Sequence, residues 1–270
     1  MGQKANTTIL QINAKKAEAP QKYDVISTEE SSVATYKSSK LLFYLTRIFE
    51  IKNYWVNQIK ITNSKKCLNI FLSFYEHKPD SQSPKDLCVI KKLINQNLLI
   101  SLNLYEKNKT ITLKTQNLNK KLSAKISTSD FYKTELKSSL IKLKPFFKNQ
   151  NFQKLIHSLI VVITNPCSSA LLNKLITNYL TENKKQHNFF LSFLKKTLTT
   201  LIKTRLSRIK GIKIVINGRL NGRPRARKTL IKIGEIPQQS MVKLIDYNES
   251  TAYTKNGTFG VKSWIASEKI

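Results

Sequence analysis

Apolar residues recur at two different spacings along this chain, and the change between them divides it into regions. Over residues 41–55 apolar side chains return every three or four positions, which predicts a helix with one buried face. Residues 55–60 and 68–75 flank a lysine-rich turn and predict two strands. A helix over 87–99 and a strand over either 99–105 or 110–115 would complete a small sheet backed by helices.

Two stretches lack such a pattern. Residues 1–38 are polar, with clusters of Ser, Thr, Lys and Glu, and predict an arm that is ordered only where it meets a partner. Residues 116–165 are rich in Lys, Ser and Asn and show no clear period, which is typical of an insertion or linker. A chain of 270 residues is long enough for two domains, and we expect one on each side of this linker.

Two helices are predicted after the linker. Pro166 cannot continue a preceding helix, and Ser168 or Ser169 can cap the next one, which runs to about residue 180. A second helix is expected over about 188–209, with Gly211 ending it.

Beyond Gly211 the apolar period becomes two, which predicts strands. Turns at Asn221–Gly222 and Asn256–Gly257 separate these strands. The expected strands cover residues 212–217, 225–233, 245–254 and 259–265. The prediction is an antiparallel sheet packed on two helices, and the fold class of the whole chain is α+β.

Charge narrows the range of partners. Lys and Arg number 47 against 16 Asp and Glu, so the formal net charge is +31 and the pI is near 10.1. No acidic residue stands between Glu182 and Glu235, an interval with fifteen Lys and Arg. Such a stretch repels itself unless a polyanion neutralises it. Nucleic acid is the favoured partner, and an anionic membrane surface is the alternative.

Arginine use sharpens this prediction. Lysine outnumbers arginine forty to seven, yet six arginines lie within 23 positions. They are Arg205, Arg208, Arg219, Arg223, Arg225 and Arg227. A planar guanidinium grips phosphate in two places at once, and Pro224 stiffens the chain between two of them. We therefore expect phosphate contacts from this segment and from the neighbouring Lys228. The abundance of Lys, Asn, Ile, Leu and Phe is typical of an AT-rich organellar gene.

Catalytic, metal and cofactor chemistry find little support. The three cysteines form no CxxC pair, the three histidines stand far apart, and no glycine-rich phosphate loop occurs. Asp246 and Glu249 are close together, but beside so many arginines an ion-pairing or positioning role is favoured over acid and base catalysis. No apolar run reaches the roughly 20 residues that span a bilayer. We expect no enzyme activity, no cofactor and no membrane insertion.

The carboxy-terminal residues resemble a known family. The resemblance rests on GIKIVINGRLNG at 211–222, GEIP at 234–237, IDY at 245–247 and GTFGVKSWI at 257–265. In order and spacing these motifs are similar to the carboxy-terminal domain of ribosomal small-subunit protein three, in its mitochondrially encoded form. The match covers residues 168–265, and the opening Met-Gly-Gln-Lys is also similar to that family.

The resemblance implies a protein in the head of the small ribosomal subunit. It would bind ribosomal RNA near the messenger RNA entry channel, beside other small-subunit proteins, in the mitochondrion. The family's amino-terminal half is a KH domain with a GxxG loop, but here no glycine lies between Gly2 and Gly211. We therefore expect four parts: an arm (1–38), a degenerate KH-like domain (39–115), an insertion or linker (116–165) and an RNA-binding domain (166–270).

The predicted RNA contacts combine the resemblance with the charge pattern. Lys195 and Lys196 occupy about the place where the family presents basic side chains to the messenger channel, although a solvated helix face is the simpler interpretation. The full predicted set is Lys4, Lys195, Lys196, Lys203, Arg205, Arg208, Lys210, Lys213, Arg219, Arg223, Arg225, Arg227 and Lys228. A free-standing organellar RNA-binding or RNA-processing factor remains the alternative function, and a membrane-surface protein or a nuclease is a weaker one.

Overall fold

A computed structural model describes most of the chain. The described residues are 21–23, 27–77, 96, 99–100, 102, 109–127, 130–146, 150–165, 167–182, 187–240 and 244–267. They fall into two compact units, one within residues 19–118 and one within 119–270. We call these the amino-terminal and carboxy-terminal units and describe each by itself. Both mix helices and strands, so the α+β class is confirmed.

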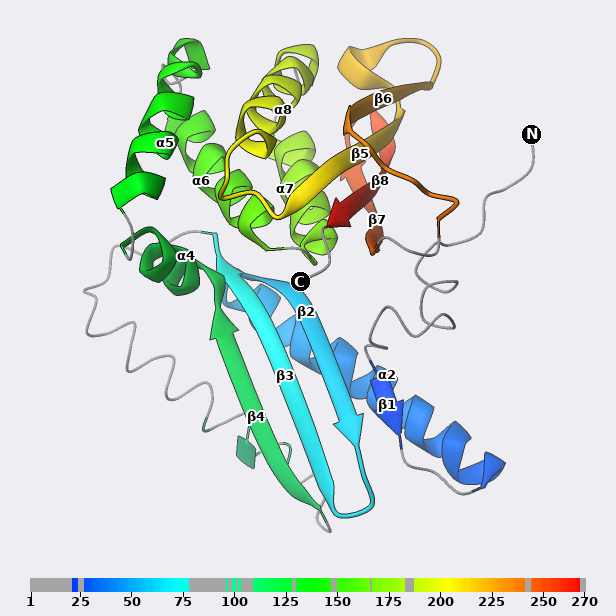
Figure 1. The fold of residues 1–270 in the computed structure, drawn as a ribbon. Coiled ribbons are helices and arrows are strands. Elements are labelled where there is room, and N and C mark those ends of the chain that lie inside the picture. Colours follow the sequence, from blue (N-terminus) through cyan, green and yellow to red (C-terminus); the bar gives the residue numbers. More distant parts are fainter. Residues whose placement is uncertain are drawn as a thin grey trace. The chain divides into compact units, whose positions relative to one another are not determined.

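The amino-terminal unit is a four-stranded sheet with one long helix, α2 (Thr28–Ile51), against it. The sheet order is β1-β2-β3-β4. Its strands are β1 (Gln21–Tyr23), β2 (Tyr54–Asn63), β3 (Cys67–Glu76) and β4 (Thr110–Asn117). The two predicted strands, β2 and β3, form an antiparallel pair, and β4 adds in parallel to β3. In Figure 1, α2 passes behind β2 and β3, and the other face of the sheet is turned to the viewer.

The core of this unit lies between α2 and one face of the sheet. Leu45 and Phe49 of α2 pack on Ile61, Ile70 and other side chains that alternate along β2 and β3. The predicted helical stripe from residue 41 is therefore confirmed, but α2 begins earlier than expected. Ser27 caps it by accepting the Glu30 N–H at 3.2 Å, and two glutamates in its first turn favour the positive end of the helix dipole.

The crossover from β3 to β4 is described only in part. The predicted helix over 87–99 lies mostly outside the described residues, although residues 96, 99–100 and 102 are helical. The strand alternative over 99–105 is wrong at these positions, and the alternative over 110–115 is confirmed by β4. Leu102 is 1% exposed and belongs to the same core as α2.

The carboxy-terminal unit is a helical layer on an antiparallel sheet with strand order β6-β5-β8-β7 (Figure 1). Its helices are α4 (Leu118–Ser127), α5 (Asp130–Ile141), η1 (Lys144–Phe146), α6 (Gln150–Thr164), α7 (Ser169–Glu182) and α8 (His187–Ile202). The remaining elements are β5 (Ile209–Gly218), η2 (Leu220–Gly222), β6 (Arg227–Gly234), β7 (Ile245–Thr254) and β8 (Gly257–Ser267). Helix α7 packs on β7 and β8, and α8 contacts β5 and β6. The predicted sheet on two helices is confirmed.

Residues 116–165 differ from the prediction of an unpatterned linker. They contain α4, α5 and α6, and α6 packs against both α7 and α8. Leu159, Val161 and Val162 of α6 are fully buried, so this helix supplies core to the carboxy-terminal unit. Packing of its apolar face stabilises α6. The polar residues that flank this face concealed the helical period in the sequence.

The predicted end of the second helix, α8, is also wrong. The helix stops at Ile202 instead of about 209, and Gly211 is a buried residue inside β5. A Cβ atom on Gly211 would stand 2.3 Å from the Glu235 carbonyl oxygen. The glycine therefore allows close backbone approach within the sheet and does not cap a helix.

Candidate nucleic-acid interface

The basic loop, residues 219–226, joins β5 to β6 and carries three of the clustered arginines. Every residue from Asn221 to Lys228 is exposed. Arg223 has φ −56° and ψ 147°, the extended conformation that a following proline favours. The predicted basic strand begins at Arg227 instead of Arg225, so Arg223 and Arg225 project from the loop.

Two reciprocal hydrogen bonds fix the basic loop to the start of α8. The Asn221 Oδ1 accepts the His187 N–H at 3.0 Å, and the Asn221 N–H donates to His187 Nδ1 at 3.0 Å. Asn221 has φ 55°, a left-handed conformation that asparagine tolerates better than most residues. The His187 ring is 1% exposed and meets Phe259 edge-on, with centroids 5.6 Å apart. The loop is thus anchored on the core and is not held by its charges.

The Arg219 side chain makes one hydrogen bond within the same loop. Its Nε donates to the Arg223 carbonyl oxygen at 2.7 Å. A guanidinium has five N–H donors, so four remain that can face a phosphate. This internal bond restrains the Arg219 side chain and so lowers the entropy lost when it binds an anion.

A second basic segment, residues 203–210, follows α8 and leads into β5. Its predicted contacts Lys203, Arg205, Arg208 and Lys210 are all exposed. Helix α5 shapes this segment, since Glu135 Oε1 accepts the Arg205 N–H at 3.0 Å. Sequence reasoning missed Glu135, because nothing in the sequence joins residues 70 positions apart.

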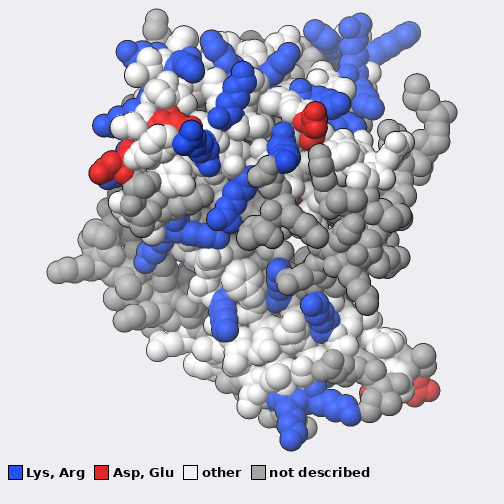
Figure 2. Space-filling model, viewed as in Figure 1, with Lys and Arg blue, Asp and Glu red and all other residues white. Residues whose placement is uncertain are grey.

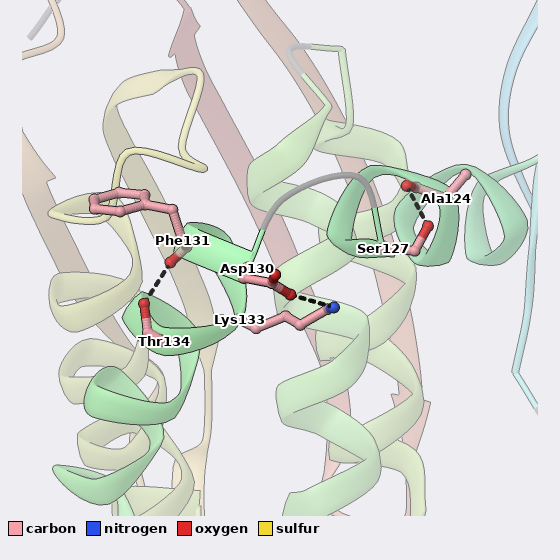
Figure 3. A network of polar contacts seen from close by, with 6 residues as sticks. All are labelled: Ala124, Ser127, Asp130, Phe131, Lys133 and Thr134. Carbon is pink, nitrogen blue, oxygen red and sulfur yellow. Dashed lines mark hydrogen bonds and ion pairs between the residues drawn. The ribbon is translucent and has the colours of Figure 1, made fainter.

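Phe131 supports the same arginine from the first turn of α5. The Arg205 guanidinium lies over its ring, 5.1 Å from the centroid, and Phe131 is 54% exposed. Figure 3 shows the Phe131 ring directed away from the Asp130–Lys133 ion pair, in which Nζ and Oδ1 are 2.7 Å apart. The ion pair and the aromatic ring therefore occupy different sides of the first turn of α5.

The remaining predicted RNA contacts are lysines, some of which are exposed and some of which contact other side chains. Lys195 and Lys196 lie on the exposed face of α8, and the Lys196 Nζ is 5.6 Å from the Phe146 ring centroid. Lys213 is half-buried in β5, donates to Gln238 Oε1 at 2.9 Å and lies 4.9 Å from the Trp264 ring. Lys4 lies outside the described residues.

The two carboxylates that the sequence singled out have structural partners. Asp246 Oδ2 accepts the Ser169 N–H at 2.9 Å at the start of α7, and desolvation raises the pKa of its carboxyl despite this hydrogen bond. Glu249 accepts the Tyr247 hydroxyl at 2.8 Å and pairs with Lys262 at 3.3 Å. These contacts lower the pKa of Glu249. Desolvation first, and then Glu249, raise the pKa of Tyr247 to about 12.

The viewer-facing side of the carboxy-terminal unit shows many Lys and Arg side chains and few acidic ones (Figure 2). The described residues hold no group of three or more His, Cys, Asp or Glu side chains arranged to bind a metal ion. None of the helices in the described ranges has the length and apolarity needed to span a membrane. The geometry is suited to binding a polyanion.

Comparison with known proteins identifies relatives of the carboxy-terminal part of the chain. A family model described as "Ribosomal protein S3, C-terminal domain" matches residues 190–265. The chain is 38% identical over 133 residues to small ribosomal subunit protein uS3c of Tupiella akineta, covering 48% of this chain and 56% of that protein. It is 35% identical over 106 residues to uS3 of Neorickettsia sennetsu, covering 39% of this chain and 48% of that one.

Over residues 190–265 the chain is similar to the carboxy-terminal domain of the ribosomal protein S3 family. It spans about half the length of these S3 relatives. The S3 domain match begins in α8 and ends in β8, so it contains the basic loop, segment 203–210 and both lysines of α8. The family resemblance seen in the sequence is confirmed.

Proposed function

We propose that this chain is a structural constituent of the small ribosomal subunit that binds ribosomal RNA through its carboxy-terminal unit. The observation that carries the proposal is the position of the anchored basic loop inside the S3 domain match. Its relatives are named as small-subunit proteins. The chain acts by neutralising and shaping folded RNA, and it catalyses no reaction.

The proposed place is the head of the subunit, near the channel through which messenger RNA enters, in a mitochondrial ribosome. Support for the channel comes from Lys195 and Lys196, which are exposed on α8. Support for the mitochondrion comes from the lysine- and asparagine-rich composition, while the relatives include chloroplast and bacterial forms. Cross-linking of 4-thiouridine messenger in assembled subunits should label the peptide with both lysines. Labelling only elsewhere on the chain would remove them from the channel.

Sedimentation tests the ribosomal assignment. A tagged chain, followed by mass spectrometry through a sucrose gradient of mitochondrial lysate, should migrate with the small subunit at high salt. A free-standing RNA-processing factor would instead remain in the light fractions. That second result would overturn the assignment without altering the RNA-binding surface.

Salt dependence tests the RNA contacts. If about 8 phosphates are neutralised, the logarithm of affinity falls against the logarithm of salt with a slope of about −6 to −7. Replacing Arg225 and Arg227 with Ala should reduce that slope by about two. Lys133→Gln is a matched control, since this lysine already pairs with Asp130. An unchanged slope in the double variant would exclude both arginines from the interface.

A further inference from the structure

The amino-terminal sheet has a face that α2 does not cover. Side chains alternate across a strand, so those next to the buried Leu68, Ile70 and Leu72 of β3 point to the opposite face. On β3 these are Asn69, Phe71 and Ser73. This face is turned to the viewer in Figure 1.

The register places an aromatic ring between two lysines on this open face. Phe71 of β3 is paired with Lys60 of β2 on one side and with Lys114 of β4 on the other. Phe71 and Lys60 are half-buried and Lys114 is exposed. Because neighbouring strands are about 4.8 Å apart, the two lysines flank the ring at close range.

The neighbouring row adds polar groups and another positive charge. Lys22, Thr62, Asn69 and Thr112 are aligned across β1, β2, β3 and β4. Thr112 Oγ1 donates to Asn69 Oδ1 at 2.5 Å, and the Thr62 hydroxyl donates to the Asn69 carbonyl oxygen at 3.5 Å. Lys22, Asn69 and Thr112 are exposed.

This face carries no negative charge in its described strands. The only carboxylate in β1, β2, β3 and β4 is Glu76, whose place beside Tyr54 puts it on the α2 side of the sheet. Its Oε1 accepts the Asn117 Nδ2–H at 2.7 Å. Figure 2 shows Lys or Arg side chains standing among uncharged ones on this side of the unit. A half-buried ring with a lysine on each side is complementary to a polyanion that carries flat bases.

We propose that the open face of the amino-terminal sheet, centred on the Lys60–Phe71–Lys114 row, binds single-stranded RNA by stacking a base on Phe71. The two lysines neutralise the phosphates on either side of the stacked base, and the row of Thr62, Asn69 and Thr112 contacts the next nucleotide. Sheets that present aromatic rings bind unpaired RNA bases in this way. This binding surface is separate from the basic loop and needs no GxxG loop.

The ring is tested with a ten-nucleotide unstructured RNA that carries a single 2-aminopurine, titrated against the full-length chain. Stacking on Phe71 should quench the 2-aminopurine fluorescence. Phe71→Leu keeps an apolar side chain but removes the ring face, so it should abolish the quenching and weaken binding about tenfold. Phe71→Tyr keeps a ring and should bind as the natural chain does. Equal binding and quenching by the Leu variant would overturn the proposal.

Substitution of the two lysines provides a second test, which remains valid even if a change at Phe71 disturbs folding. Lys60→Gln together with Lys114→Gln should reduce the salt slope for this RNA by about 1.4, since each phosphate contact with a single strand contributes about 0.7. Lys40→Gln is the matched control, because Lys40 is exposed on α2, on the other side of the sheet. If the double variant leaves both slope and quenching unchanged, the face does not bind RNA, and an acidic protein surface becomes its fitting partner.

The same titration in an Arg225→Ala, Arg227→Ala background separates this site from the basic loop. The background should lower overall affinity but leave the 2-aminopurine quenching at saturation intact. Quenching that disappears in this background would place the stacked base at the carboxy-terminal unit and overturn the proposal.

Discussion

Replacing Asn221 with Ala should destabilise the carboxy-terminal unit far more than its exposed position suggests. The side-chain oxygen of Asn221 accepts the first N–H of α8, and its own N–H donates to His187. Asn221 also has φ 55°, which an alanine adopts only with strain. One substitution thus removes a helix cap and strains the loop that carries the arginines.

The magnitude follows from these two terms. Loss of a side-chain cap costs about 1 kcal/mol, and the left-handed conformation costs an alanine about 1–2 kcal/mol. Asn221→Ala should therefore lower the free energy of unfolding by about 2–3 kcal/mol. Asn221→Gly also removes the acceptor oxygen but tolerates the positive φ, so it should cost only the roughly 1 kcal/mol of the lost cap. Asn221→Asp keeps an acceptor oxygen and should resemble the natural chain.

The chain offers a convenient probe for this measurement. Its two tryptophans lie in different units, Trp55 in β2 and Trp264 in β8. Trp264 is half-buried beside Tyr247, with ring centroids 5.1 Å apart, so its fluorescence should report unfolding of the carboxy-terminal unit. Urea titrations of the Asn221 variants in a Trp55→Phe background give the free energies, provided that the slope against urea is unchanged.

The comparison of Ala with Gly decides the outcome. If the two variants are equally stable, backbone strain at Asn221 contributes nothing. If Asn221→Ala is as stable as Asn221→Asp, the hydrogen bond from the His187 N–H to the Asn221 side chain does not stabilise the unit. That second result would contradict the account of an anchored basic loop.

Two further predictions concern the sheet and its contact with α7. Gly211→Ala should lower the free energy of unfolding by about 1–3 kcal/mol, because the added Cβ would meet the Glu235 carbonyl. Gly260→Ala is the control: nothing lies within 4 Å of its added Cβ, so the free energy should change by less than about 0.5 kcal/mol. Equal urea midpoints for the two variants would contradict this prediction. The raised pKa of Asp246 means that the folded chain binds more protons just above pH 3.8, so the contribution of this residue to stability falls as pH rises through the folded pKa. Asp246→Asn keeps an acceptor for the Ser169 N–H, and its stability relative to the natural chain should improve from pH 4 to pH 7; a relative loss over that range would contradict the sign.

The sequence predicted the sheet of the carboxy-terminal unit well because apolar residues recur there at every second position. Ile212, Ile214 and Ile216 are all buried on one face of β5, as the period of two requires. The family resemblance lay in the same strands and their turns. Local pattern and tertiary structure agree there, so local reasoning is sufficient.

Helix boundaries depended on contacts that the sequence does not display. Leu206 continues the apolar stripe of α8, but it is buried in a turn whose Arg205 N–H is held by Glu135 of α5. A glycine after a helical pattern is a common helix end, and this made Gly211 misleading. Its actual constraint is the Glu235 carbonyl across the sheet.

Helix α6 could have been found. Phe152, Leu155, Ile156, Leu159 and Ile163 are buried and recur at helical spacing. The lysines and asparagines before them concealed the period. For the candidate site, charge clustering selected arginines that are exposed in the structure. The residues that position them, His187 and Glu135, are not basic and carry no such signal.

The parallel pairing of β3 with β4 has a consequence for the growing chain on a translating ribosome. The two strands are adjacent in space but separated by 33 residues, so the hydrogen-bonding groups along one side of β3 have no strand partner until Thr110–Asn117 has left the exit tunnel. An unpaired strand edge recruits other extended chains. A nascent chain that stalls before Thr110–Asn117 has emerged should therefore be a better substrate for chaperones than one that stalls after this strand has left the tunnel.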